Sequence, residues 1–185
     1  MSRFGIFVVG LIAISLMQGA EARAQAHVSA YAQATGASLQ SPNVSHVYGG
    51  TFGFLYELDR GPVLVGVDAR GAIMSRGSSV GPFNDQAFNM GQAGIRVAAP
   101  GLLHGINALA PYAEGALGLG YWRGGITPAR QDSNQFLYQA IGGLDYRVWQ
   151  KLGWRVAEIT YGRMGAIPGH VNPITVSSGI VYHFN

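Results

Sequence analysis

The chain of 185 residues contains no cysteine, few charged residues and a single lysine, Lys151. Without cysteine, disulfide bonds and thiolate metal sites are excluded. Asp, Glu, Lys and Arg make up 11% of the chain, well under half of the roughly 25% usual in soluble domains. Hydrophobic residues reach 48%, yet beyond the N-terminal segment they do not gather in long runs. This composition is typical of a protein whose outer surface faces lipid.

The charges that are present are dispersed and mixed in sign. The formal net charge of +3 comes from a small total number of ionised groups, so no nucleic-acid partner is expected. The basic residues are almost all arginine, which favours paired or bidentate contacts over mere solubility.

The N-terminal segment has the features of a secretory leader. Arg3 supplies a positive charge, Phe4 to Met17 form an apolar run, and small-residue patterns around residues 22–26 offer cleavage sites. A retained membrane anchor is the alternative, but the run is shorter than the roughly 20 residues of a spanning helix. The sequence predicts a signal peptide over 1–24 and one domain over 25–185.

The rest of the chain reads as strands separated by Gly, Pro, Asn, Asp and Ser, the residues of hairpin turns. Long and short connections largely alternate, as they do when short turns face the periplasm and longer loops face outside. An even number of strands then leaves both termini in the periplasm. The eight predicted strands cover residues 28–36, 46–58, 63–76, 87–99, 112–123, 136–148, 154–165 and 174–184.

Within these strands one face is apolar and the other is small and polar with single charges. In the third strand, for example, Val65 and Val67 share one face while Asp68 and Arg70 share the other. The fourth strand is ambiguous, because Phe88 and Met90 have the parity of Arg96. A soluble β-sandwich would also alternate, but its polar face would be rich in Lys, Glu and Thr. A face of Gly, Ala and Ser instead favours the narrow interior of a barrel.

The resemblance to a known family rests on three segments. The glycine-rich strands "AEGALGLGYW" and "YQAIGGLDYRV" and the ending "SSGIVYHFN" resemble the eight-stranded outer-membrane barrels related to the OmpA transmembrane domain, OmpX and Ail. The resemblance implies an all-β, eight-stranded antiparallel up-and-down transmembrane barrel in the outer membrane. It also implies insertion by the barrel-assembly machinery, with Tyr182 and Phe184 as the C-terminal signal. Asn185 departs from this pattern, since such barrels usually end on the aromatic residue.

The charged residues assigned to the interior should pair with one another, because an unpaired charge at low dielectric costs several kcal/mol. The pairing predicts a structural plug, and the alternative is a gate in which an arginine exchanges carboxylate partners. The predicted lumen network is Glu57, Asp68, Arg70, Arg96, Glu114, Asp145, Arg147 and Glu158.

Motifs for catalysis, cofactors or metals are not apparent. The five histidines show no short metal-pair spacing, and Gly118-Leu119-Gly120 lacks the pattern of a dinucleotide site. We therefore expect no catalytic residues, no cofactor and no metal. The main hypothesis is a non-enzymatic barrel with an envelope-structural or surface-interaction role. Alternatives are a lipid A deacylase or acyltransferase, although the deacylase pattern His-x-Ser-Asn is absent, and a narrow pore or carrier of small apolar ligands.

Two arginines are candidates for contact with lipopolysaccharide. Arg123 and Arg163 each follow an outward-facing tyrosine by two positions, near the predicted outer ends of their strands. An aromatic ring at the membrane interface with an arginine above it would place the guanidinium level with lipid phosphates. Ordinary solvated arginine at a loop edge is the alternative.

Overall fold

A computed structural model describes residues 25–40, 45–76, 86–102, 108–126, 129–165 and 171–184. The predicted signal peptide, residues 1–24, and Asn185 lie outside the described residues. No helix within the described ranges is long and apolar enough to cross a membrane.

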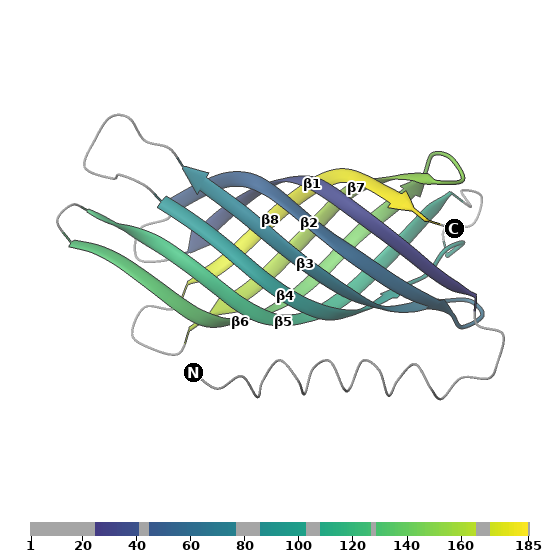
Figure 1. Cartoon of the computed structure of the whole chain (residues 1–185), viewed down its shortest axis with the longest axis horizontal. Helices are drawn as coiled ribbons and strands as arrows, with labels where there is room; N and C mark the ends of the chain where they lie inside the picture. The colour runs from purple at the N-terminus through teal and green to yellow at the C-terminus, as the bar shows by residue number, and fades with distance from the viewer. Residues whose placement is uncertain are drawn as a thin grey trace.

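Eight antiparallel strands form a closed barrel (Figure 1). Each strand pairs with the next in the chain, and β8 pairs with β1 to complete the ring. All eight predicted strands are present, so the predicted fold class is confirmed. The strands are β1 (Ala26–Gln40), β2 (Ser45–Asp59), β3 (Leu64–Arg76), β4 (Gln86–Ala98), β5 (Leu109–Ile126), β6 (Ala129–Arg147), β7 (Leu152–Met164) and β8 (Asn172–His183).

The strands β5 and β6 are longer than the sequence indicated. Residues 124–135 were expected to form a loop, but pairing continues past Arg123 and Asp132 to Ile126 and Ala129. Figure 1 shows this hairpin reaching beyond the neighbouring strands. The glycine and polar residues that suggested a loop are compatible with a ladder once two strands are already in register.

The barrel has two ends that are distinguished by their connections. We call the end that carries the β1/β2, β3/β4, β5/β6 and β7/β8 connections the loop end. The other, which we call the terminal end, carries the β2/β3, β4/β5 and β6/β7 connections and both described chain ends.

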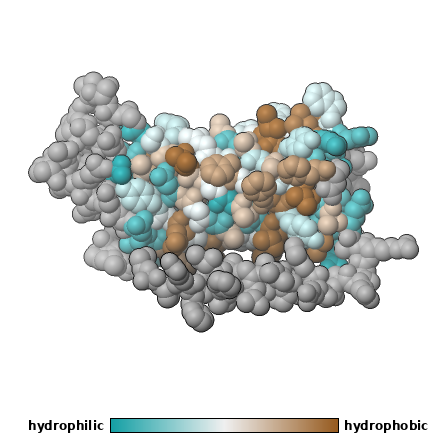
Figure 2. All heavy atoms as spheres, in the orientation of Figure 1, coloured by the Kyte–Doolittle hydropathy of each residue, from teal (hydrophilic) through white to brown (hydrophobic). Residues whose placement is uncertain are grey.

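The outer wall is largely apolar, as the alternation predicted. On the face shown in Figure 2, hydrophobic side chains are spread over the wall of the barrel, and hydrophilic ones are more frequent toward its ends. A closed sheet with such a wall satisfies its backbone groups internally and presents hydrocarbon to lipid. The exposed residues include Phe52, Phe54, Ile73, Ile95, Leu117, Leu119, Phe136, Ile159, Tyr161, Val176 and Ile180.

Candidate functional site

The interior at the terminal end is built around Arg70. Its guanidinium contacts Asp68 and Glu114 at 2.6 Å each and Glu158 at 2.9 Å. Asp68 and Arg70 face the lumen together because they are two positions apart on β3. The hydroxyl of Tyr31 donates to both oxygens of Asp68, at 2.8 and 2.9 Å. One arginine therefore holds carboxylates from three strands.

A second group extends from Glu158 toward the barrel mouth. Arg155 contacts Glu158 at 3.2 Å and Asp145 at 2.8 Å. Arg96 contacts the same Asp145 at 2.7 Å and Glu57 at 3.2 Å. Since Glu158 bridges Arg70 and Arg155, the eight charges form one continuous network across the lumen.

Two tyrosine rings line this network and complete its contacts. The guanidinium of Arg96 lies 3.7 Å from the ring centre of Tyr112, and that of Arg155 lies 4.3 Å from the ring centre of Tyr31. The hydroxyl of Tyr112 donates to Glu158 at 2.6 Å. Rings packed against guanidinium groups exclude water and add cation–π attraction, which strengthens with desolvation.

The network contains seven of the eight predicted residues, with two differences. Arg147 is exposed at the end of β6 and stays outside the network. Its parity matches that of Asp145, but the strand ends there and the side chain lies at the mouth. Arg155, by contrast, has no exposed surface and carries two of the ion pairs, although sequence reasoning did not include it.

A β-bulge explains why Arg155 was missed. Arg155 is opposite Gly179 and Glu158 is opposite Ser177, so three steps on β7 match two steps on β8. Residues three apart face opposite sides of a regular strand, but the extra residue turns both inward. The signal in the sequence was an arginine, Arg155, at the parity of the outward-facing Ile159 and Tyr161.

The interior at the loop end is apolar. Phe88 and Met90 point inward and are buried. The sequence alone did not decide which face of the fourth strand they occupy. Methionine is flexible enough to fill an irregular lumen without strain. The apolar cluster consists of Ala37, Leu39, Val47, Ala72, Met74, Phe88, Met90, Leu137, Met164 and Val171, with Trp122 packed against it. The expectation of a small, polar interior is therefore wrong for this end of the barrel.

At the terminal end the lumen opens as a vestibule. A cavity of about 300 Å³ there is lined by, among others, Glu57, Arg96, Arg147 and His183. It reaches the charged network, where Glu57 and Arg96 are buried. Water that enters the mouth thus meets ion-paired side chains, then buried polar residues such as Thr35 and Thr51, with the apolar cluster beyond them.

One serine and histidine pair lies near this vestibule. The Ser29 hydroxyl is 2.8 Å from Nδ1 of His183, which lines the vestibule. A deacylase would need such residue types, but Ser29 is 1% exposed and lies inside the wall, whereas acyl chains lie outside it. Within the described ranges, no three His, Asp or Glu side chains are grouped as metal ligands would be.

The residues assigned to lipid contact lie on the outer wall. Arg123 donates from Nε to the Tyr121 hydroxyl at 3.0 Å, and its guanidinium is 5.5 Å from that ring centre. Arg163 is exposed on β7, two positions after the exposed Tyr161. At the other end, the exposed rings of Tyr182 and Phe184 pack edge to face with centres 5.3 Å apart.

Comparison with known proteins places the architecture. No protein-family model and no curated protein matches the chain. Among solved structures, Neisserial surface protein A is 15% identical with a TM-score of 0.57, covering 85% of this chain and 98% of that one. The attachment invasion locus protein Ail of Yersinia pestis is 13% identical with a TM-score of 0.52, covering 85% and 97%. The fold is that of the eight-stranded outer-membrane β-barrels. At such identities the likeness concerns the fold alone and assigns no activity.

Proposed function

We propose that this outer-membrane barrel is a non-enzymatic envelope protein with a structural or surface-interaction role and a lumen that stays shut. The observation that carries the proposal is the filled interior, in which the charged network, buried polar residues such as Gln33 and Thr35, and the apolar cluster follow one another along the axis. A solute would have to separate buried ion pairs and then enter a packed apolar region. Both steps are costly.

The proposal places the barrel in the outer membrane with both termini in the periplasm. Because the number of strands is even, both described chain ends share the terminal end with the connections at residues 60–63, 99–108 and 148–151. Turns at the periplasmic end of such barrels are typically short, which the first and last of these three connections match. Tyr182 and Phe184 would serve the barrel-assembly machinery as the C-terminal insertion signal.

Planar-bilayer recording tests the closed lumen. The purified wild-type protein should give little or no channel activity, whereas stable, large conductances would refute the proposal. A gate is the second candidate, because Arg96 is shared between Glu57 and Asp145 at the inner limit of the vestibule. Brief, small openings that change in frequency in a Glu57→Gln variant would favour the gate.

Arg123 and Arg163 are the proposed contacts to lipopolysaccharide phosphates. Both lie on the outer wall, and the Tyr121 hydroxyl orients the Arg123 guanidinium. Guanidinium groups bind phosphate bidentately. Replacing both arginines with glutamine should weaken stabilisation by added lipopolysaccharide while leaving folding in neutral detergent unchanged. Equal stabilisation of variant and wild type by lipopolysaccharide would refute the assignment of these two arginines as phosphate contacts.

A further inference from the structure

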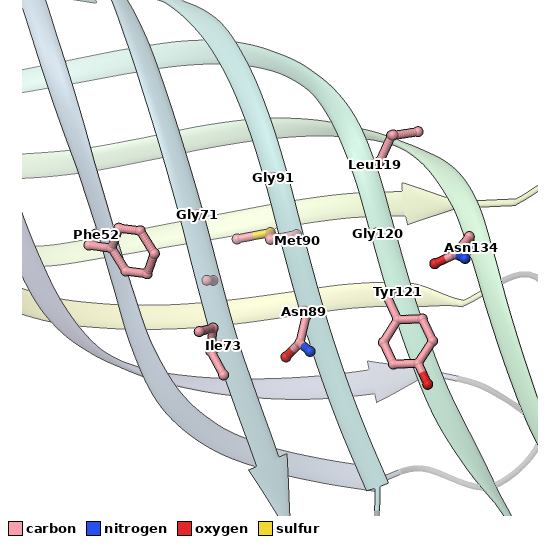
Figure 3. Close-up of a pocket in the computed structure, with 11 residues that line it drawn as sticks. Phe52, Gly71, Ile73, Asn89, Met90, Gly91, Leu119, Gly120, Tyr121 and Asn134 are labelled. Atoms are coloured by element: carbon pink, nitrogen blue, oxygen red, sulfur yellow. The ribbon is translucent and has the colours of Figure 1, made fainter. Parts of the chain in front are cut away.

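The outer wall has a hollow across β2 to β6 (Figure 3). The hollow has a volume of about 300 Å³, roughly ten times the share of one water molecule in the liquid. Phe52 and Leu119 flank it, and Gly71 and Gly91 lie between them. These four residues are consecutive cross-strand neighbours on β2, β3, β4 and β5.

The glycine at position 91 is not required by the packing of the barrel. A Cβ atom built there would meet nothing within 4 Å, whereas at Gly118 it would lie 2.2 Å from a backbone oxygen. Gly118 must therefore lack a side chain for the barrel to close, but Gly91 lacks one without any internal reason. A glycine inside a lipid-facing strand also weakens that strand. Gly115 has the same freedom, but only Gly91 lies in the hollow, where the missing side chain leaves space that a ligand can fill from the outside.

The hollow changes from apolar to charged along the wall. The next cross-strand row toward the loop end contains Ile73, Asn89, Tyr121 and Asn134. In the row beyond it, Arg123 lies opposite Ala87 on β4 and Asp132 on β6. Apolar, hydrogen-bonding and cationic groups in this order match an amphiphile that has an acyl chain, a polar linkage and a phosphate.

Asn89 supplies the most specific sign of a ligand. It lies at the rim of the hollow between Ile73 and Tyr121 (Figure 3). Its Oδ1 atom is buried and has no hydrogen-bond partner among the described residues. A buried amide oxygen without a partner is costly, so a turn of the Asn89 side chain that lets Oδ1 accept from a ligand's hydroxyl or amide N–H in the hollow would be favoured.

We propose that the hollow holds one acyl chain of lipopolysaccharide, with a hydroxyl or amide N–H of its lipid A at Asn89 and a phosphate at Arg123. The acyl chains of lipid A carry such donors next to the phosphorylated sugars. The ester-linked chains of a glycerophospholipid bring no donor to that depth. This inference rests on the proposed contact of Arg123 with lipopolysaccharide and adds a binding groove to it.

Filling the hollow tests the proposal, and Gly115 provides a matched control. A Cβ atom on Gly115 also meets nothing within 4 Å, and this exposed glycine on β5 lies outside the hollow. Gly91→Phe and Gly115→Phe should both fold, as shown by a compact band in unboiled detergent gels. The apparent affinity for purified lipopolysaccharide is then read from the temperature at which that band is lost.

Gly91→Phe should bind lipopolysaccharide about tenfold more weakly than wild type, a difference of about 1.4 kcal/mol, while Gly115→Phe should bind as wild type. Asn89→Leu should reduce the preference for lipopolysaccharide over phosphatidylglycerol.

If Gly91→Phe binds as wild type while the Arg123/Arg163 double variant is impaired, the groove is refuted and the phosphate contacts stand. If lipopolysaccharide does not stabilise the wild type, both the groove and the phosphate contacts are refuted. Equal response to the two lipids, or a monomer–dimer equilibrium altered by Gly91→Phe, would show another occupant and overturn the proposal.

Discussion

The interior of the barrel is filled by charged side chains in one half and by apolar side chains in the other. At the terminal end, five carboxylates and three arginines are held together by ion pairs and tyrosine hydroxyls. At the loop end, ten buried apolar residues pack against one another. The charged half depends on each partner being present, since a lost arginine leaves buried charge behind. In the apolar half, a substitution that removes side-chain atoms leaves a cavity but no buried charge.

The largest effect should come from the centre of the charged half. Arg70→Met leaves Asp68, Glu114 and Glu158 without their shared cation and should lower the free energy of unfolding by about 3–5 kcal/mol. Urea unfolding in lipid vesicles measures the loss. Arg147→Met is the control, because its exposed side chain lies outside the network, and its change should stay within about 0.5 kcal/mol. Similar losses for both variants would contradict the assignment of the network.

An intermediate effect is expected in the apolar half. Phe88 has no exposed surface, and Phe88→Ala should cost about 3 kcal/mol in the same unfolding assay, through lost burial and a residual cavity. The lumen should nevertheless stay non-conducting in planar bilayers, since the charged network still blocks it. Conductance in Phe88→Ala alone would show that the apolar cluster is the sole seal.

The smallest effect should come from a carboxylate within the charged half. Five carboxylates face three arginines, and Oε1 of Glu114 has no hydrogen-bond partner among the described residues. Glu114→Gln keeps the shape of the side chain and removes one excess negative charge, so the free energy of unfolding should change by less than about 1 kcal/mol. Asp68→Asn, which disturbs contacts to both Arg70 and Tyr31, should cost more. A reversed order would show that the network needs all five charges.

The alternation of side chains along the strands was sufficient to predict most of the fold and seven of the eight residues of the network. It identified Glu57, Asp68 and Glu158 as inward-facing because the side-chain period of a strand is two. It failed for Arg155, where the bulge shifts the period, and for Arg147, where the strand ends. Parity also carries no information about height along the axis. The separation of Phe88 and Met90 from the charged residues therefore became visible only once the strand register was known.

The bulge in β7 also has a consequence for the length of the chain. On the β6 side, Ala157 is opposite Leu144 and Arg155 is opposite Asp145, which leaves Val156 as the additional residue. Deleting one residue from a regular strand turns all later side chains to the wrong face. Deleting Val156 would instead leave Arg155 and Glu158 two positions apart, both still facing the lumen. This strand thus contains one site at which the barrel can be shortened with its inside and outside preserved.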